Sequence, residues 1–133
     1  MVYRKQTEKL LDWNMRSYDY ETVEKSKVAD GYETTNVWKI DPCFDKIHSA
    51  VFPIELCKRV IQYYSYKGDL IFDPFAGSGT VGRTAKALER LFFLTEQEPK
   101  YFEYMKSKAK QSIIFNEIET KFLTLEQFKV IAR

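Results

Sequence analysis

The clearest pattern along the chain begins at Pro53, where apolar residues recur at helical spacing with polar residues between them. The recurring positions are Ile54, Cys57, Ile61 and Tyr64. This spacing predicts an amphipathic helix with Pro53 in its first turn. A turn follows at residues 67–68, and the apolar run at residues 69–73 predicts a short buried strand.

The alternation of helix and strand continues after a breaker-rich loop at residues 74–79. Two further helices are predicted, with a strand at residues 91–94 between them and Pro99 at the start of the second helix. Their apolar stripes are Val81, Ala85 and Leu88 in the first and Phe102, Met105 and Ala109 in the second. A third strand is predicted at residues 121–125. This order of elements predicts an α/β fold whose parallel strands are joined by crossover helices.

The first third of the chain has no sustained period. A short helix is predicted at residues 6–13, and irregular structure over the rest of residues 1–35. Residues 34–40 are rich in β-branched and aromatic side chains, which predicts a short strand.

Composition narrows the class of protein. The 133 residues are 44% hydrophobic, which is enough for one compact core. Lys and Arg total 21 against 19 Asp and Glu, and this near balance excludes a polybasic arm and an acidic disordered tail. We expect a cytoplasmic protein without a membrane partner, because no apolar run approaches the roughly 20 residues that span a bilayer. Two cysteines and one histidine are too few for a four-ligand zinc site.

The strongest candidate for chemistry is the loop at residues 73–80 (DPFAGSGT), which lies between a predicted strand and a predicted helix. Open α/β sheets bind their ligands at such places, and Gly77 and Gly79 allow a ligand to approach the backbone closely. With Gly82 they also satisfy the dinucleotide fingerprint, and Glu96 follows Gly77 by 19 residues, as expected of an acid that binds a ribose hydroxyl. A dinucleotide-binding module and a turn without a ligand both stay open at this point.

The charge of Asp73 discriminates between the classes of ligand that such a loop can bind. A pyrophosphate beside Asp73 would bring like charges together in a partly desolvated crevice. S-adenosylmethionine has an ammonium and a sulfonium, no phosphate, and a ribose that Glu96 can bind. A phosphate-binding P-loop is excluded because no Lys follows Gly79. As structural alternatives, Asp73 is a cap or turn residue and Glu96 a solvated acid.

The loop resembles the cofactor-binding motif of the amino DNA methyltransferases, which methylate adenine N6 or cytosine N4. Three more segments are similar to motifs of that family and occur in the family's order. Residues 48–53 (HSAVFP) resemble its HPAxFP motif with Ser49 in place of proline, and residues 37–40 (VWKI) resemble its vWxI strand. Glu96 lies in a segment similar to its GxExxxxY motif, with Leu94 in place of the glycine.

This resemblance implies part of a Rossmann-like, S-adenosylmethionine-dependent methyltransferase sheet, with S-adenosylmethionine as cofactor and DNA as partner. It implies that the glycine loop holds the methionyl part of the cofactor, that Glu96 binds its ribose, and that the segment before the first regular helix closes the pocket. The cofactor-binding residues implied are His48, Ala50, Phe52, Asp73, Phe75, Ala76, Gly77, Ser78, Gly79, Thr80 and Glu96. The implied activity is site-specific DNA methylation of the restriction-modification kind.

The family's catalytic motif, Asp/Asn/Ser-Pro-Pro-Tyr/Phe, is absent, because the chain has no Pro-Pro pair. Residues 41–44 (DPCF) resemble a degenerate copy, but they lie just before His48, and we interpret them as a connecting loop. In the family the catalytic strand pairs with the strand that carries the glycine loop, so residues 70–73 should present an open edge. We therefore expect half of an enzyme, inactive alone, whose complementary chain or missing segment carries the Pro-Pro motif. Association of two copies through the open edge is the other expectation.

The resemblance also suggests a division of the chain. Residues 37–133 form a cofactor-binding α/β half-domain, and residues 1–36 an irregular segment related to a target-recognition region. Two alternatives stay open: a non-catalytic partner subunit, which the departures at Ser49 and Leu94 favour, and a dinucleotide-binding module, which the 53 residues after Thr80 disfavour.

Overall fold

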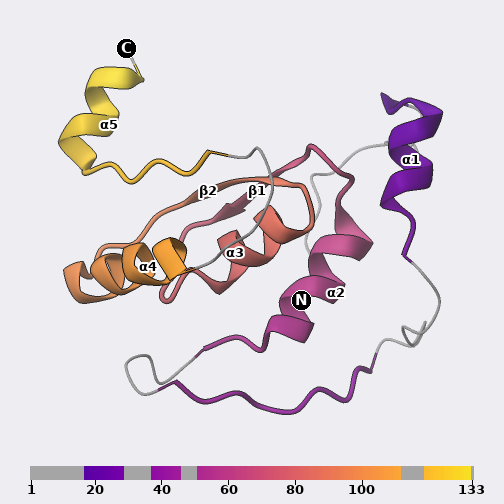
Figure 1. Ribbon diagram of the computed structural model, residues 1–133, viewed down its shortest axis with the longest axis horizontal. Helices are drawn as coiled ribbons and strands as arrows, with labels where there is room; N and C mark the ends of the chain where they lie inside the picture. The colour runs from indigo at the N-terminus through magenta and orange to yellow at the C-terminus, as the bar shows by residue number, and fades with distance from the viewer. Residues whose placement is uncertain (1–16, 29–36, 46–50, 112–118, 133) are drawn as a thin grey trace, which may run out of the picture.

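The computed structural model describes residues 17–28, 37–45, 51–111 and 119–132 (Figure 1). The elements in chain order are α1 (Tyr20–Ser26), α2 (Ile54–Tyr64), β1 (Leu70–Asp73), α3 (Thr80–Ala87), β2 (Leu91–Leu94), α4 (Pro99–Gln111) and α5 (Leu125–Ile131). β1 and β2 pair in parallel, with Leu70 opposite Leu91 and Asp73 opposite Leu94, and α3 connects them. The predicted α/β fold with parallel strands and crossover helices is confirmed. Within the described ranges, no helix has the length and apolarity needed to cross a membrane.

The amphipathic helix predicted after Pro53 is α2, and it begins one residue later than expected. Pro53 is its N-cap, with φ −55° and ψ 135°, and the carbonyl of Pro53 accepts the first helical hydrogen bond from the amide of Cys57 at 3.2 Å. Cys57 and Ile61 are buried, whereas Ile54 and Tyr64 at the two ends of the stripe are exposed. The helical period therefore identified the helix correctly, and only the middle of its apolar stripe reaches the core.

The core lies on one side of the sheet, where α3 packs against both strands and against α2. Its buried apolar residues among those described are Cys57, Ile61, Ala76, Ala85 and Met105. Gly82 allows α3 to approach β2 closely, because a Cβ at this position would lie 2.5 Å from Leu94 Cδ1. Since β2 carries leucine at position 94, the helix needs a glycine at the point of contact.

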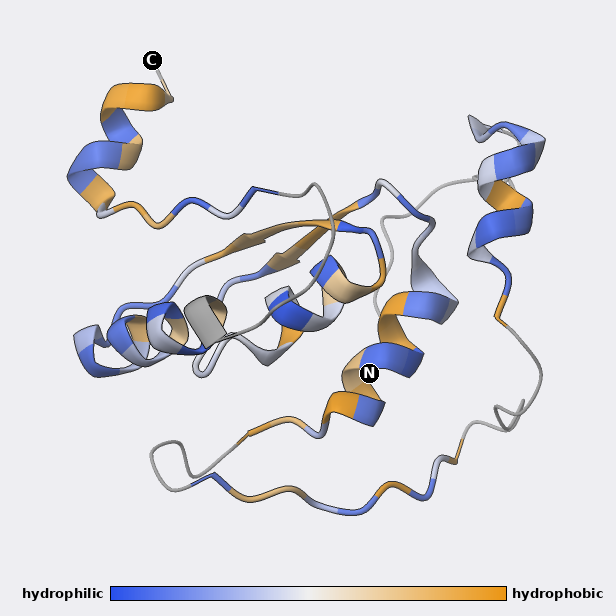
Figure 2. Ribbon diagram, in the orientation of Figure 1, coloured by the Kyte–Doolittle hydropathy of each residue, from blue (hydrophilic) through white to orange (hydrophobic). Residues whose placement is uncertain are grey.

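Within the described part of the chain, the opposite side of the sheet is largely exposed. Leu70 and Phe72 of β1 are 64% and 58% exposed, and Leu91 and Phe93 of β2 are also exposed. We call these four side chains the open face. Figure 2 shows both strands in hydrophobic colours although one of their faces is uncovered. The prediction of a buried strand at residues 69–73 is therefore wrong for this face, because α3 packs on the other face, against Phe92 and Leu94, with α2 behind it.

Three other sequence-based predictions are corrected. Residues 20–26 form α1 in place of irregular structure, because Asp19 caps the helix by accepting a hydrogen bond from the amide of Thr22 at 2.9 Å. Residues 121–124 form no strand, and α5 begins at Leu125 with a capping box between Thr124 and Gln127. The helix predicted at residues 6–13 lies outside the described residues.

The third correction concerns the strand predicted at residues 34–40. Its described part, residues 37–40, pairs with no strand. Their aromatic residue packs onto a helix. The Trp38 ring stacks on Tyr63 of α2 with centroids 5.6 Å apart, and the Arg59 guanidinium lies 5.8 Å from the centre of the Trp38 ring. The aromatic content that favoured a strand here serves contacts between side chains.

The segment around α1 is anchored to the turn before β1. The Tyr18 hydroxyl donates to Asp69 Oδ1 at 2.5 Å, and the Tyr18 and Tyr66 rings lie 4.3 Å apart. The amide of Lys67 donates to Ser26 Oγ at 2.9 Å. The hydrogen bond to the Asp69 carboxylate, reinforced by burial, raises the pKa of Tyr18 to about 12.

This anchor predicts a pH dependence of stability. Because the pKa of Tyr18 is raised from 10.0 to about 12 on folding, its stabilising contribution is complete below pH 10 and is lost as the pH rises through 12. We expect the melting temperature of the wild type to fall more steeply between pH 10 and 12 than that of Tyr18→Phe. Thermal unfolding followed by circular dichroism measures this, with Tyr20→Phe on the exposed side of α1 as the control. Equal slopes for wild type and Tyr18→Phe would contradict it.

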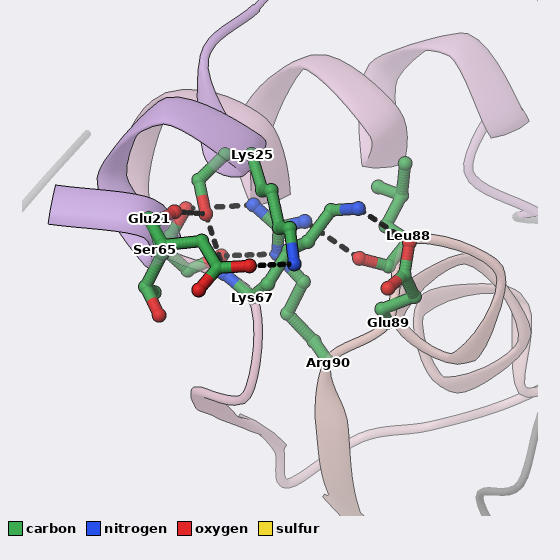
Figure 3. Close-up of polar contacts among 9 residues, drawn as sticks. Glu21, Lys25, Ser65, Lys67, Leu88, Glu89 and Arg90 are labelled. Carbon is green, nitrogen blue, oxygen red and sulfur yellow. Dashed lines mark hydrogen bonds and ion pairs between the residues drawn. The ribbon is translucent and has the colours of Figure 1, made fainter. Parts of the chain in front are cut away.

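A buried arginine joins the ends of α2 and α3 (Figure 3). Arg90 is 2% exposed, and its guanidinium donates to the carbonyl of Leu88 at 2.6 Å and to the carbonyl of Ser65 at 2.8 Å. Its Nε donates to the Ser65 hydroxyl at 3.3 Å, and burial lowers the pKa of Arg90. Lys67 and Glu89 form an ion pair of 2.5 Å between the same two turns. These contacts fix the start of β1 relative to the start of β2.

Candidate functional site

The glycine loop connects β1 to α3 and is largely buried. Gly77 and Gly79 have φ of 52° and 74°, in the left-handed region that favours glycine. The amide of Gly79 donates to the carbonyl of Ala76 at 2.8 Å, which closes a tight turn. A Cβ on Gly79 would lie 2.5 Å from Met105 Cγ of α4. Both the turn and the contact with Met105 therefore require glycine at position 79.

The residues after β2 hold the first half of this loop. The amide of Thr95 donates to the carbonyl of Asp73, and the amide of Ala76 donates to the carbonyl of Thr95, both at 3.0 Å. The Thr95 hydroxyl donates to the carbonyl of Pro74 at 2.8 Å. Backbone pairing thus continues past the carboxyl ends of both strands, which is the edge where α/β sheets bind ligands.

Glu96 lies directly against the glycine loop. Its Oε2 accepts a hydrogen bond from the amide of Gly77 at 2.7 Å, and its Oε1 accepts one from the amide of Glu98 at 2.8 Å. The alternative that Glu96 is merely a solvated acid does not fit these contacts. A loop that binds phosphate offers its amides to the anion. Here the Gly77 amide donates to a carboxylate and the Gly79 amide donates to the Ala76 carbonyl, so both glycine amides are already engaged within the protein, which disfavours a pyrophosphate.

Asp73 combines a structural contact with a charge at the start of the loop. Its Oδ1 accepts a hydrogen bond from the amide of Phe75 at 3.0 Å, as in a turn residue. The pKa of the Cys57 thiol is raised to about 11, first by burial and then by the negative charge of Asp73. Asp73 therefore acts electrostatically on the core side of the loop as well. Carboxylates therefore lie at both sides of the glycine loop, and together they favour a cationic ligand over a phosphate.

Arg83 of α3 contacts the loop, and the sequence analysis missed it. Its Nη1 donates to the carbonyl of Ser78 at 2.5 Å and its Nη2 to Thr80 Oγ1 at 3.2 Å. The Ser78 and Thr80 hydroxyls are hydrogen-bonded to each other at 2.9 Å. Burial lowers the pKa of Arg83. The signal in the sequence was its position three residues after Thr80, which places it on the same side of the first helical turn.

The remaining candidate site residues differ in how far they are buried. Ala76, Ser78 and Thr80 are buried in the loop, and Phe75 at its outer side is 87% exposed. Phe52 is exposed just before α2. His48 and Ala50 lie outside the described residues.

The described residues on the two sides of residues 46–50 are hydrogen-bonded to α4 and to each other. The Tyr104 hydroxyl of α4 donates to the carboxylate of Asp45, and the Cys43 thiol donates to the carbonyl of Val51 at 3.3 Å. Residues 41–44 have neither helix nor strand, and Phe44 among them is exposed, so their interpretation as a connecting loop is confirmed.

The fold and this loop define the class of the protein: it has the fold of the S-adenosylmethionine-dependent methylases. The structure of TTHA0409, a putative DNA modification methylase of Thermus thermophilus, superposes with a TM-score of 0.59 and 28% identity over 87% of this chain and 42% of that one. A second structure of the same protein, complexed with S-adenosyl-L-methionine, superposes with a TM-score of 0.54 and 27% identity over 84% of this chain and 39% of that one.

The chain belongs to the N6/N4 DNA methylase family, whose model matches residues 1–107. The type II methyltransferase M.Cfr9I of Citrobacter freundii is 35% identical over 88 residues, which are 65% of this chain and 29% of that protein. M.HinfI of Haemophilus influenzae, also a type II methyltransferase, is 29% identical over 123 residues, which are 85% of this chain and 33% of that protein. The chain thus spans about a third of the length of these curated relatives.

Proposed function

We propose that this chain is the S-adenosylmethionine-binding part of a site-specific DNA methyltransferase that modifies an exocyclic amino group of adenine or cytosine. The observation that carries the proposal is the hydrogen bond from the Gly77 amide to Glu96, with Asp73 at the start of the same loop. Two carboxylates against the single guanidinium of Arg83, together with the occupied amide, suit a sulfonium and an ammonium and disfavour phosphates. Membership of the family and the S-adenosyl-L-methionine complex of TTHA0409 support the same conclusion.

Different residues in and around the loop bind different parts of the cofactor. Asp73 and the backbone of residues 77–79 hold the methionyl part, and Arg83 keeps the Ser78 carbonyl and the Thr80 hydroxyl in place. Each Glu96 oxygen accepts one amide hydrogen bond, which leaves a lone pair on each for ribose hydroxyls. Phe75, Ala76 and Thr80 shape the site, and His48, Ala50 and Phe52 close it from the segment before α2. When bound, S-adenosylmethionine supplies the electrophilic methyl group on its sulfonium.

The acceptor side of the reaction comes from outside these 133 residues. The chain has no Pro-Pro pair, so the group that holds the target amino nitrogen belongs to a complementary chain or to a further segment. In this proposal residues 37–133 are the cofactor-binding half-domain, residues 1–36 belong to a target-recognition region, and the chain alone transfers no methyl group.

Leu94 occupies the position of the glycine in the family motif that the sequence resembles, which suggested a degenerate copy. The structure offers a physical reason for the exchange. Leu94 packs against Gly82, where a Cβ would lie 2.5 Å from Leu94 Cδ1, so the larger residue on β2 is matched by the smallest one on α3. The departure at position 94 is therefore accommodated in the packing and does not by itself argue for loss of function.

The proposal is tested by calorimetric titration of the chain with S-adenosylmethionine and with nicotinamide adenine dinucleotide. We expect the chain to bind S-adenosylmethionine and not the dinucleotide. Glu96→Gln and Asp73→Asn should each bind S-adenosylmethionine about 10-fold more weakly, a loss of about 1.4 kcal/mol in binding free energy. Glu98→Gln is the matched control, since Glu98 is exposed two residues away and only its backbone amide contacts Glu96. Tighter binding of the dinucleotide, or unchanged affinity in both variants, would overturn the proposal.

A further inference from the structure

The Arg83 guanidinium holds the second half of the glycine loop beside α4. Its two terminal nitrogens donate to the carbonyl of Ser78 at 2.5 Å and to the Thr80 hydroxyl at 3.2 Å. A Cβ on Gly79 would lie 3.5 Å from Arg83 Nη1 and 2.5 Å from Met105 Cγ of α4. The backbone of the loop is therefore bonded to the guanidinium and bounded by α4, and its position depends on where the guanidinium lies.

A hydrogen-bonded pair of side chains lies near this guanidinium. The Tyr104 hydroxyl, next in sequence to Met105 on α4, donates to the carboxylate of Asp45 in the segment before α2. Burial lowers the pKa of Arg83, while Tyr104 and Asp45 act to raise it. A carboxylate beside a partly buried guanidinium offsets part of the cost of removing that charge from water. Asp45 thus supplies a counter-charge for Arg83, and Tyr104 fixes the Asp45 carboxylate.

The pair joins parts of the chain that are distant in sequence. Asp45 precedes α2, Arg83 belongs to α3, and Tyr104 belongs to α4. By contrast, the ion pair of 2.9 Å between Glu103 and Lys106 joins residues one turn apart on α4. A contact between elements restrains their relative positions, whereas a contact within one turn does not. The contact of Asp45 with Tyr104 can therefore position the loop through Arg83.

We propose that Asp45 and Tyr104 are positioning residues of the cofactor site: their pair holds the Arg83 guanidinium against the glycine loop, and Arg83 in turn fixes the backbone that binds the methionyl part of S-adenosylmethionine. This inference rests on the proposed function. In this arrangement both residues act through Arg83, and neither touches the cofactor. The ribose is bound separately by Glu96, so loss of the pair weakens binding of the methionyl part selectively.

Calorimetric titration with two ligands tests this selectivity. 5′-Methylthioadenosine contains the adenosine and the sulfur of S-adenosylmethionine but lacks the amino acid portion. We expect Asp45→Asn and Tyr104→Phe each to weaken binding of S-adenosylmethionine about 5-fold, as for the loss of one hydrogen bond, and to leave the affinity for 5′-methylthioadenosine unchanged. Glu103→Gln, at an exposed position beside Tyr104, is the matched control and should change neither affinity.

Two further measurements isolate the route through Arg83. In an Arg83→Met background, Asp45→Asn should weaken binding of S-adenosylmethionine no further, because the group that the pair positions is gone. Amide hydrogen exchange reports on the loop without a ligand. The Gly79 amide, which donates to the carbonyl of Ala76, should exchange faster in Tyr104→Phe, while the Leu88 amide after α3 should be unchanged.

The inference is overturned by unchanged affinity for S-adenosylmethionine in both single variants, by an equal loss of affinity for both ligands, or by full additivity of Asp45→Asn with Arg83→Met. Failure of the proposed function is a different result, in which the unmodified chain binds no S-adenosylmethionine. Hydrogen exchange then still decides the inference, because unchanged exchange of the Gly79 amide in Tyr104→Phe would show that the pair does not position the loop.

Discussion

Gly79→Val is expected to weaken binding of S-adenosylmethionine by about 100-fold, a loss of about 2.7 kcal/mol. Position 79 has φ of 74°, a conformation that costs an L-residue about 1–2 kcal/mol and a β-branched residue more. The new Cβ would also lie 2.5 Å from Met105 Cγ and 3.1 Å from Met105 Sδ. Both problems are relieved by movement of the loop backbone, which displaces the Ser78 carbonyl from Arg83. Calorimetric titration measures the affinity.

Gly68→Val is the matched control for this variant. Gly68 also has a positive φ, of 86°, but a Cβ there would meet nothing within 4 Å, and the turn lies at the opposite end of β1. We expect Gly68→Val to lower the free energy of unfolding by about 1–2 kcal/mol and to leave the affinity for S-adenosylmethionine unchanged. Adding Met105→Ala to Gly79→Val should restore part of the affinity, because it removes the clash and leaves the backbone strain. Wild-type affinity in Gly79→Val would show that the loop does not hold the cofactor.

Arg90→Met is expected to lower the free energy of unfolding by about 3 kcal/mol, measured by urea denaturation. The substitution keeps much of the side-chain volume but removes the guanidinium. The carbonyls of Leu88 and Ser65 then lose their donor in a site where Arg90 is 2% exposed. Buried acceptors without a donor cost about 1–3 kcal/mol each.

Two further variants separate the charge of Arg90 from its geometry. Arg90→Lys keeps the charge but does not reproduce two donors directed at two carbonyls, so we expect most of the loss to persist. Lys129→Met removes an exposed partner of Glu126 on α5 and should change stability by less than about 0.5 kcal/mol. A loss in Arg90→Met no greater than that in Lys129→Met would mean that the contacts at the ends of α2 and α3 do not stabilise the fold.

The periodic elements could be predicted from the sequence because their signals are local. The stripe of α2 and the apolar runs of β1 and β2 depend on residue spacing alone, and all three elements form where expected. Residues 121–125 show the limit of such signals. Their β-forming side chains predicted a strand, but the capping box of Thr124 and Gln127 starts α5. A helix signal that satisfies backbone donors outweighs weak strand propensity when no neighbouring strand is present to pair with.

The candidate site was predictable in its position but not in its contacts. The spacing from Gly77 predicted that Glu96 binds a ribose hydroxyl beside the glycine loop, and the structure brings the Glu96 carboxylate to the Gly77 amide. Which donor the carboxylate takes depends on how β2 and the loop meet in three dimensions, and spacing carries no such information. Arg83 was missed for the same reason, because its partners are a carbonyl and a hydroxyl that only the folded turn presents to it.

The apolar runs of β1 and β2 suit a more enclosed environment than the described residues give them. Their continuous hydrophobicity is typical of strands enclosed on both sides, yet the structure encloses one side. The sequence thus predicted strands that are covered on both faces, whereas the described residues cover them on one face.

The contact between Gly82 and Leu94 has a consequence for variation in this protein. The leucine on β2 fills the volume that any side chain at position 82 would need, so the sizes of the two residues are tied to each other. A methyl group can be gained on α3 only if β2 gives up volume at position 94, whereas shortening Leu94 first leaves a cavity without a clash. During divergence of this protein, the strand position must therefore shrink before the helix position can grow, and Phe92, 3.2 Å from the same Cβ, must also give way.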